Sequence, residues 1–389
     1  MKSNYKKIGD YVCQVSNRNT DLNVTNLKGI NINKEFMPSV ANINGTDLSK
    51  YKVVQKGQFA FNPMHVGRDE MLPISLWLED EPIIVSPAYV VFEILDHNIL
   101  DPNYLMMWCK RSEFDRNCWF TTDSSVRGGF SWDNFCDLEL PIPSLDTQQL
   151  FINEFDSVIK EIHLCEKIEF NLSLQSETLF RKWFLDFEDN NVEKNFNDLI
   201  GLHLPSNFVV EEIGNFVDLL QGQVINATTN HLICDSGIPL LRIQDLKNNE
   251  ECIFMSEDTP KSKICNVKDI IVSRTGVVGL VFRNRIGVVH NNCFTVKSNS
   301  NILSNDYLYY FLRSSIAREM MINLAGGSVQ SDLSHVKFNT IPIIIPPIEL
   351  QNKFCNHLNN IENFIEVKIY KKKILKKLGN VLLSKMSQI

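Results

Sequence analysis

Two long segments of the chain carry apolar residues at alternating three- and four-residue steps. From Asp146 to about Asp186 these positions are Phe155, Val158, Ile162, Cys165, Leu172 and Leu179. From Glu349 to about Ser387 they are Phe354, Leu358, Ile361, Ile365, Leu375 and Leu382. This spacing places one apolar stripe along a helix. We therefore predict two helices of about forty residues, each about 60 Å long, that bury their stripes against each other.

The rest of the chain has a different pattern, in which short apolar runs alternate with Gly, Pro and Asn. Runs rich in β-branched or aromatic residues predict strands, and they lie at 83–85, 88–92, 270–272 and 294–296. Helices are predicted at Tyr104–Phe114 and Tyr307–Glu319, with Asn103 and Asp306 as their N-caps. Residues 1–144 and 205–347 are thus expected to form mixed α/β domains, each with a twisted sheet.

The same order of features occurs twice along the chain. Lys7-Ile8-Gly9-Asp10 in the first half corresponds to Glu212-Ile213-Gly214-Asn215 in the second, and Tyr307 follows Tyr104 after 203 positions. Gln351, after the Ile341-Pro342-Ile343 run, follows Gln148 by the same 203 positions. Because several anchors recur in order near one spacing, we interpret the chain as an internal duplication.

The duplication predicts an α+β fold in four segments. They are a first mixed domain (1–144), a central helix (145–204), a second mixed domain (205–347) and a C-terminal helix (348–389). If the helices pair as an antiparallel coiled coil, the domains are related by pseudo-two-fold symmetry. Such an arrangement suits a protein that reads two DNA half-sites, and equally a coiled-coil adaptor whose domains bind proteins.

Composition narrows the class of protein. The 389 residues are 44% hydrophobic and 22% charged, as in ordinary folded proteins. The N-terminus has no apolar secretory core and no run is long enough to span a membrane, so a cytoplasmic location is expected. The ten cysteines form no C-x-x-C pair and no zinc pattern, and we expect buried, reduced thiols and no metal. The net charge of −7 is mild evidence against a nucleic-acid partner but does not exclude local basic surfaces.

Several stretches resemble the specificity subunit of type I restriction–modification systems. In the first domain they are Val53–Met64 and Ile84–Tyr89. In the second they are Ile213-Gly214, Ile238–Ile243, Asp269–Gly279, Gly326–Gln330 and Ile341–Ile343 followed by Glu349-Leu350-Gln351. The resemblance covers nearly the whole chain and includes the order domain, helix, domain, helix.

The resemblance implies a non-catalytic DNA-binding subunit with two target-recognition domains. Its partners would be double-stranded DNA, read as an asymmetric bipartite sequence, and two methyltransferase subunits; the complex can also recruit restriction subunits. No cofactor is expected in this chain, since S-adenosylmethionine would bind to the methyltransferase subunits.

The main alternative from another class is an enzyme, a methyltransferase or nuclease acting alone. Asp101-Pro102-Asn103-Tyr104 resembles the loop in which amino-methyltransferases hold their target amine. However, Asn103 replaces a proline, the repeat partner Ser304-Asn305-Asp306-Tyr307 lacks the proline, and no F-x-G-x-G loop follows a strand. A capped helix start explains the motif better.

Contacts to DNA are expected from Arg, Asn, Gln and Ser side chains in turns. The candidates are Asn62, Arg68, Ser125 and Arg127 in the first domain and Arg242, Gln244, Ser273, Arg274, Asn291, Asn292, Ser328 and Gln330 in the second. Each could instead stabilise its own turn. The glycines of Gly276-Val277-Val278-Gly279 could admit a phosphate or only a hairpin turn. Trp119 and Trp132 are predicted to be core residues, and the lysines from Lys368 to Lys377 a solvated helix surface.

Overall fold

A computed structural model describes residues 4–39, 45–64, 66–122, 129–186, 193–249, 251–326 and 331–388. The chain divides into two compact units, each formed from two separate segments. The first unit comprises Met1–Leu164 and Lys371–Ile389, and the second comprises Cys165–Tyr370. Each unit therefore contains one mixed domain together with one half of each long helix.

The two long helices are present as predicted. Helix α5 spans Leu145–Phe184 and helix α10 spans Ile348–Lys385. The segment 145–204, predicted as one helix, is helical only to Phe184, because a hairpin of β11 (Lys194–Asn197) and β12 (Leu202–Pro205) occupies its end. The helix starts, Leu145 and Ile348, lie 203 positions apart, so the duplication includes them.

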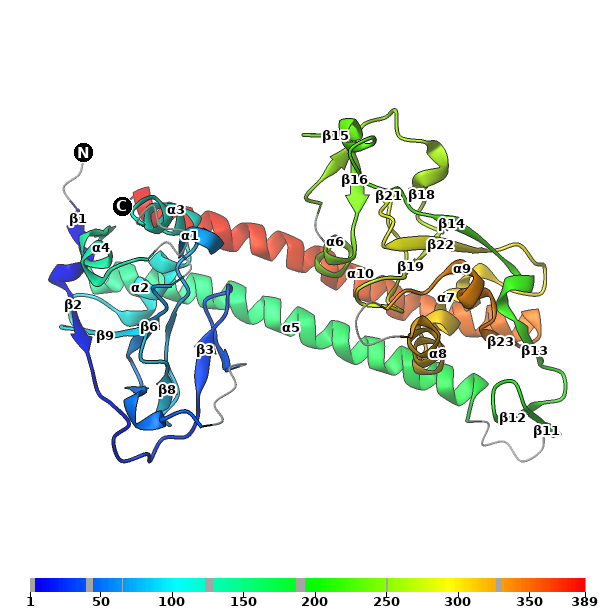
Figure 1. The fold of residues 1–389 in the computed structure, drawn as a ribbon, viewed down its shortest axis with the longest axis horizontal. Helices are drawn as coiled ribbons and strands as arrows, with labels where there is room; N and C mark the ends of the chain where they lie inside the picture. The colour runs from blue at the N-terminus through cyan, green and yellow to red at the C-terminus, as the bar shows by residue number, and fades with distance from the viewer. Residues whose placement is uncertain are drawn as a thin grey trace. The chain divides into compact units, whose positions relative to one another are not determined.

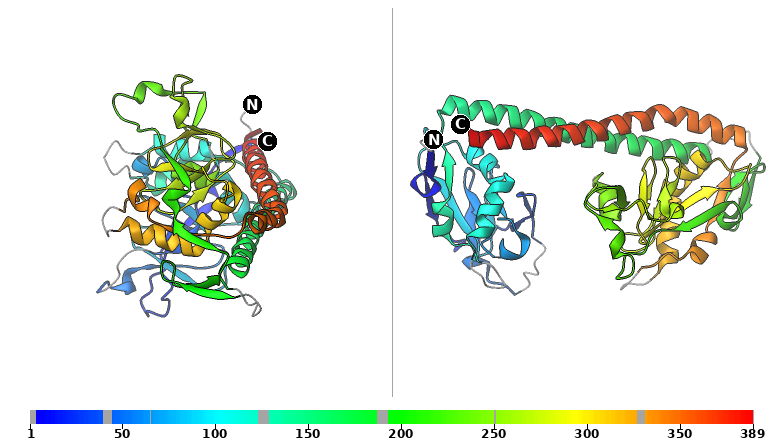
Figure 2. Two further views of the ribbon diagram at one scale, coloured as in Figure 1. Left: turned by 90° about the vertical axis from the view of Figure 1, so that its right-hand side faces the viewer. Right: turned by 90° about the horizontal axis from the view of Figure 1, so that it is seen from above.

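Within each unit the halves of α5 and α10 pack side by side (Figure 2). In the second unit the rings of Phe180 and Trp183 contact Phe354, with centroids 5.9 and 5.6 Å apart. In the first unit Gly379 faces Phe155, and Lys371 Nζ lies 2.5 Å from the Glu161 carboxylate. Residue numbers that rise along α5 fall along α10, so the pairing is antiparallel. The predicted coiled coil is confirmed.

A four-stranded antiparallel sheet forms the centre of each mixed domain, with the same connection of strands (Figure 1). In the first domain the order is β2 (Val12–Val15), β9 (Val90–Ile94), β6 (Phe59–Phe61) and β7 (Ile74–Leu76). In the second domain the order is β14 (Val217–Gln221), β22 (Cys293–Ser298), β19 (Ile270–Ser273) and β20 (Val281–Phe282). The apolar runs named from sequence thus supply strands, and the α+β class is confirmed.

Smaller sheets complete each domain. In both, a strand near the domain's start pairs antiparallel with one near its end, β1 (Tyr5–Lys7) with β10 (Glu139–Pro141) and β13 (Val209–Glu212) with β23 (Pro342–Ile345). The first domain adds β3 (Lys28–Ile30) with β4 (Phe36–Pro38) and β5 (Lys52–Val54) with β8 (Ile83–Val85). The second adds a five-stranded sheet in the order β15 (Ile233–Cys234), β17 (Phe254–Met255), β16 (Ile238–Leu241), β21 (Gly287–Val289) and β18 (Ile264–Cys265).

The helix predicted after each four-stranded sheet is a pair of helices instead of one. In the first domain α2 (Pro102–Cys109) and α3 (Ser112–Phe120) meet at Arg111. In the second α7 (Asn305–Arg313) and α8 (Ser315–Ala325) meet at Ser314. The predicted N-caps were also wrong: the side chains of Asp101 and Ser304 cap α2 and α7, since Asn103 and Asp306 lie inside the first turn. Short helices complete the domains: α1 (Val66–Asp69), α4 (Trp132–Asp137), α6 (Ile243–Asn248) and α9 (His335–Asn339).

Two buried glutamines tie the long helices to their domains with matching hydrogen bonds. Gln148 Nε2 donates to the carbonyls of Ile99 and Pro143, and its Oε1 accepts from the N–H of Asp101. Gln351 does the same with Ile302, Pro346 and Ser304. Both glutamines are fully buried. The repeat therefore extends from element order to individual contacts.

The cores are apolar, and two of the sequence predictions about buried side chains need correction. Tyr104 and Tyr307 are both fully buried at corresponding positions. None of the ten cysteines is in a disulfide, and six are buried, but the expectation of buried thiols is wrong for Cys13, Cys136 and Cys234, which are half-buried, and for the exposed Cys252. Trp132 packs in an aromatic cluster with Phe61, Phe92 and Phe135. Trp119, predicted as core, is 45% exposed near the end of α3.

Candidate nucleic-acid interface

Several candidate residues of the second domain meet where β14 and β19 end and β22 begins. The backbone N–H of Arg274 donates to the carbonyl of Asn292 over 2.8 Å. The side chain of Gln221, at the end of β14, donates to the carbonyl of Asn291 over 2.9 Å. Arg274, Asn291 and Asn292 were predicted from sequence and lie together at this edge of the sheet.

Arg274 is held by two further residues that the sequence reasoning missed. Its Nε and Nη2 donate to the two carboxylate oxygens of Asp332, each over 2.9 Å. Its Nη1 donates to Gln221 Oε1 over 2.7 Å. A guanidinium has five N–H donors, so two remain for a ligand. The side chain is 21% exposed. The arrangement orients a cation at the surface and leaves it able to bind a phosphate or a guanine edge.

Gly222 makes this convergence possible. A Cβ at this position would lie 2.3 Å from the carbonyl oxygen of His290, which is too close for any side chain. The N–H of Gly222 donates to the carbonyl of Cys293, and that of Gln223 donates to the carbonyl of Val289. The chain after β14 thus packs directly on the turn before β22. In the sequence, the only local sign of this contact was a glycine between two glutamines. No pattern near Asp332 indicated that it pairs with Arg274.

Ser273 supports the loop after β19 from beneath. Its side chain is fully buried, and its hydroxyl donates to the carbonyl of Val277 and accepts from the N–H of Leu280. Gly276 and Gly279 have φ values of +71° and +77°. The hairpin geometry therefore explains both glycines. Binding of a phosphate there stays a prediction.

Arg242 and Gln244 lie at the start of α6, and Arg242 is near His290 in the turn before β22. The guanidinium of Arg242 forms a two-point ion pair with Asp245 at 2.6 and 2.9 Å, which raises the pKa of Arg242. Gln244 is exposed. Burial, and then the charge of Arg242, lower the pKa of His290. A neutral imidazole fits its contact, since His290 Nδ1 accepts from the N–H of Asn292.

The first domain has no arginine at the position of Arg274. The N–H of Phe130 donates to the carbonyl of Pro63, just as the N–H of Leu333 donates to the carbonyl of Arg274. Since Leu333 follows Phe130 by 203 positions, Pro63 corresponds to Arg274. Asn62 is half-buried, and its Oδ1 accepts from the N–H of Met64. The side chain of Arg68 and residues Ser125, Arg127, Ser328 and Gln330 lie outside what the structure describes.

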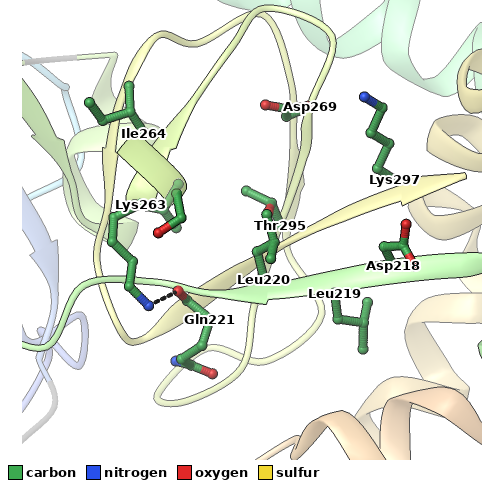
Figure 3. A pocket seen from close by; sticks show the side chains of 11 residues that line it. Asp218, Leu219, Leu220, Gln221, Lys263, Ile264, Asp269, Thr295 and Lys297 are labelled. Carbon is green, nitrogen blue, oxygen red and sulfur yellow. Dashed lines mark hydrogen bonds between the residues drawn. The ribbon is translucent and has the colours of Figure 1, made fainter. Parts of the chain in front are cut away.

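A shallow hollow of about 400 Å³ lies on the four-stranded sheet of the second domain (Figure 3). Lys263 lines it and donates to the carbonyl of Gln221 over 2.8 Å. Lys297, Asp218 and Asp269 also line it. Because its charges are mixed, the hollow is a weaker candidate for binding an anion than the edge at Arg274.

The motif that resembles a methyltransferase loop forms a capped helix start. Asp101 accepts from the N–H of Asn103 over 2.8 Å, and Tyr104 is fully buried. Over the described ranges, no three His, Cys, Asp or Glu side chains are grouped as a metal site would require. Nor does any helix in those ranges have the length and apolarity to cross a membrane.

The lysines on α10 are mainly on the surface. Lys371, Lys373, Lys376 and Lys377 are exposed, and Lys368 and Lys372 are half-buried. Lys371 pairs with Glu161 of α5. These positions agree with the solvated helix surface expected from sequence.

The sequence is similar to a known protein family and to proteins from two organisms. Residues 205–378 match the family described as type I restriction modification DNA specificity domain. The chain is 24% identical over 362 residues to the putative type I restriction enzyme MjaX specificity subunit of Methanocaldococcus jannaschii, covering 89% of this chain and 81% of the relative. It is 20% identical to the HindI specificity subunit of Haemophilus influenzae, over 82% and 83% of the two chains.

A solved structure has the same fold. The crystal structure of the type I restriction–modification S subunit from M. genitalium aligns over 98% of this chain and 95% of that one, with a TM-score of 0.53 and 13% identity. The solved structure shows the fold, and the two relatives named above are specificity subunits that align with more than four-fifths of this chain. The second half of the chain matches the type I restriction modification DNA specificity domain, and the chain as a whole is similar to specificity subunits of type I restriction–modification systems.

Proposed function

We propose that this chain reads an asymmetric, bipartite DNA sequence and brings methyltransferase and restriction subunits to it. The observation that carries the proposal is the duplication: the four-stranded sheet of the domain that matches the DNA specificity family in the second half recurs with the same strand order in the first. A specificity subunit is the targeting component and not the catalyst. S-adenosylmethionine would therefore bind to two methyltransferase partners in the cytoplasm.

The second domain would contact DNA through the edge formed by Arg274, Asn291 and Asn292. The ion pair with Asp332 holds the guanidinium in one orientation, which reduces the entropy lost on binding. Two remaining N–H groups suit the O6 and N7 atoms of guanine or a phosphate. Neighbouring Asn side chains suit adenine edges. A local cation of this kind is compatible with the net charge of −7.

The two domains would read different sequences because their corresponding positions differ. Pro63, which has no donor, stands where the second domain has Arg274. The long helices join the domains, so their length would set the number of unread base pairs between the two half-sites.

A reconstitution experiment tests the proposal. The purified chain, a type I methyltransferase subunit and labelled S-adenosylmethionine are incubated with mixed-sequence DNA, and methylated adenines are mapped by sequencing. We expect methylation only when both proteins are present, at one bipartite sequence. Methyl transfer by the chain alone would favour the enzyme alternative. Equal affinity for all sequences would favour the adaptor.

Substitutions locate the contacts. Arg274→Ala should weaken binding to the cognate duplex about tenfold or more through one half-site only, because a bidentate pair contributes about 1–3 kcal/mol. Arg181→Ala is the matched control: Arg181 is also ion-paired, to Asp186, but lies on α5. If cognate affinity survived Arg274→Ala and Arg68→Ala together, the contact assignment would be wrong.

A further inference from the structure

The duplication places two corresponding helix N-termini against the long helices, one in each unit. In the second unit α8 begins at Ser315 beside α5. In the first unit α3 begins at Ser112, and the hollow at its start is also lined by Asn380 of α10. Ser112 and Ser315 lie 203 positions apart.

In the second unit a carboxylate of the chain itself occupies this N-terminus. Glu177 Oε1 accepts from the backbone N–H of Ser315 over 2.9 Å and from its hydroxyl over 2.8 Å. The side chain of Ser314 caps the helix by accepting from the N–H of Ala317. Both contacts satisfy N–H groups that have no partner inside the helix, and the negative charge suits the helix dipole.

In the first unit both of these groups are replaced. Asn380 stands 203 positions after Glu177, and Arg111 stands 203 positions before Ser314. Helix α3 consequently has no side-chain cap. Arg111 is 6% exposed, and its Nε has no hydrogen-bond partner within the described ranges. Its guanidinium instead stacks on Trp108, 4.0 Å from the ring centroid.

The first unit also has a larger and more basic hollow at this place. Its volume is about 590 Å³, against about 360 Å³ for the corresponding hollow beside Glu177. Three cations line it (Lys34, Lys110 and Arg111), together with the two acids Glu113 and Asp115. Lys34 pairs with Asp115 at 2.7 Å. Glu113 lies 3.6 Å from Arg111. Among these five side chains the cations outnumber the acids by one, although Glu35 and Asp156 also act on Lys110, and burial lowers the pKa of Arg111.

We propose that this hollow binds the carboxylate of an acidic side chain presented by a partner protein. The second unit supplies the same group in cis, so the geometry accepts a carboxylate. A DNA phosphate is less suitable, because Glu113 and Asp115 would repel a polyanion. The choice of a methyltransferase subunit as the partner rests on the proposed function; the carboxylate specificity does not.

The first test needs only the full chain. Asn380→Glu restores the carboxylate that the second unit has, and Asn380→Gln is the control of equal size without charge. We expect Asn380→Glu to unfold about 2–4 °C above Asn380→Gln, the shift that a charge at a helix N-terminus produces in a unit of this size. The reciprocal Glu177→Gln should lower the melting temperature. Equal melting of the two Asn380 variants would overturn the proposal.

The second test measures the partner. A methyltransferase subunit is titrated onto each variant, and DNA affinity is measured in parallel. We expect Asn380→Glu to weaken subunit binding at least tenfold, since its own carboxylate fills the hollow, whereas Asn380→Gln does not. Unchanged subunit binding, or a loss confined to DNA affinity, would overturn the assignment to a partner protein. If the unaltered chain bound no methyltransferase subunit, the proposed function would fail, while the melting test would still decide the carboxylate site.

Discussion

The buried Gln351 offers a direct test of how the long helix is fixed to the second domain. Its side chain makes three hydrogen bonds to backbone groups, at 2.7 Å to Ile302, 2.7 Å to Pro346 and 2.8 Å to Ser304. Gln351→Ala leaves all three groups without this partner. Each bond contributes about 1 kcal/mol, and more where the orphaned group stays buried. We expect a loss of about 3 kcal/mol, a change of more than a hundredfold in the local opening equilibrium.

Hydrogen–deuterium exchange read by mass spectrometry measures this loss where it occurs. Peptides that cover the start of α7, at residues 302–308, should lose protection by about a hundredfold, while peptides from the first unit should not change. Gln148→Ala should give the reciprocal result at residues 99–105. Asn352→Ala is the matched control, since Asn352 is the exposed neighbour on the same helix. A change below fivefold at residues 302–308 would refute the energetic argument.

Three further predictions concern packing, charge and thiol chemistry. Gly9→Ala and Gly214→Ala should each destabilise their unit by about 1–3 kcal/mol, because the new Cβ would lie 2.7 Å from the Cβ of Cys136 or Asn339, respectively. Gly29→Ala is the control and should not destabilise its unit, because the nearest atom to its new Cβ would be 3.8 Å away. Equal melting temperatures for the three variants would contradict this prediction. Glu362→Gln should cost about 3 kcal/mol, largely independent of salt, because Arg313 and Arg283 lie 3.1 and 3.5 Å from a carboxylate that is 10% exposed. In urea titrations the exposed control Glu161→Gln should change stability by less than about 1 kcal/mol, and a similar effect of both would refute the claim. Burial raises the pKa of Cys109, Cys265, Cys293 and Cys355 to about 12. Each of these thiols therefore keeps its proton until the pH nears that value. At pH 8 iodoacetamide should label the exposed Cys252 at least about tenfold faster than these four thiols, as peptide mass spectrometry can check.

The sequence alone determined the features that are periodic or repeated. The apolar stripes predicted α5 and α10, because a helix must bury one face and its period is visible over forty residues. The recurrence of Tyr104 as Tyr307 and of Gln148 as Gln351 predicted the duplication. Local capping was predicted less well. Asp101 caps α2, and Pro102 stands at the first helical position, where proline is common.

Tertiary structure decided which residues meet. Gln221, Arg274 and Asp332 lie on segments more than fifty positions apart, and the pairing of β14 and β19 with β22, together with the absence of a side chain at Gly222, brings them together. Likewise, Glu177 and Asn380 are unremarkable polar residues in the sequence, and only antiparallel packing shows that they occupy corresponding places beside α8 and α3. The physical reason is that helix and strand periods are local properties of the chain, whereas a binding site depends on distances between elements that no local pattern records.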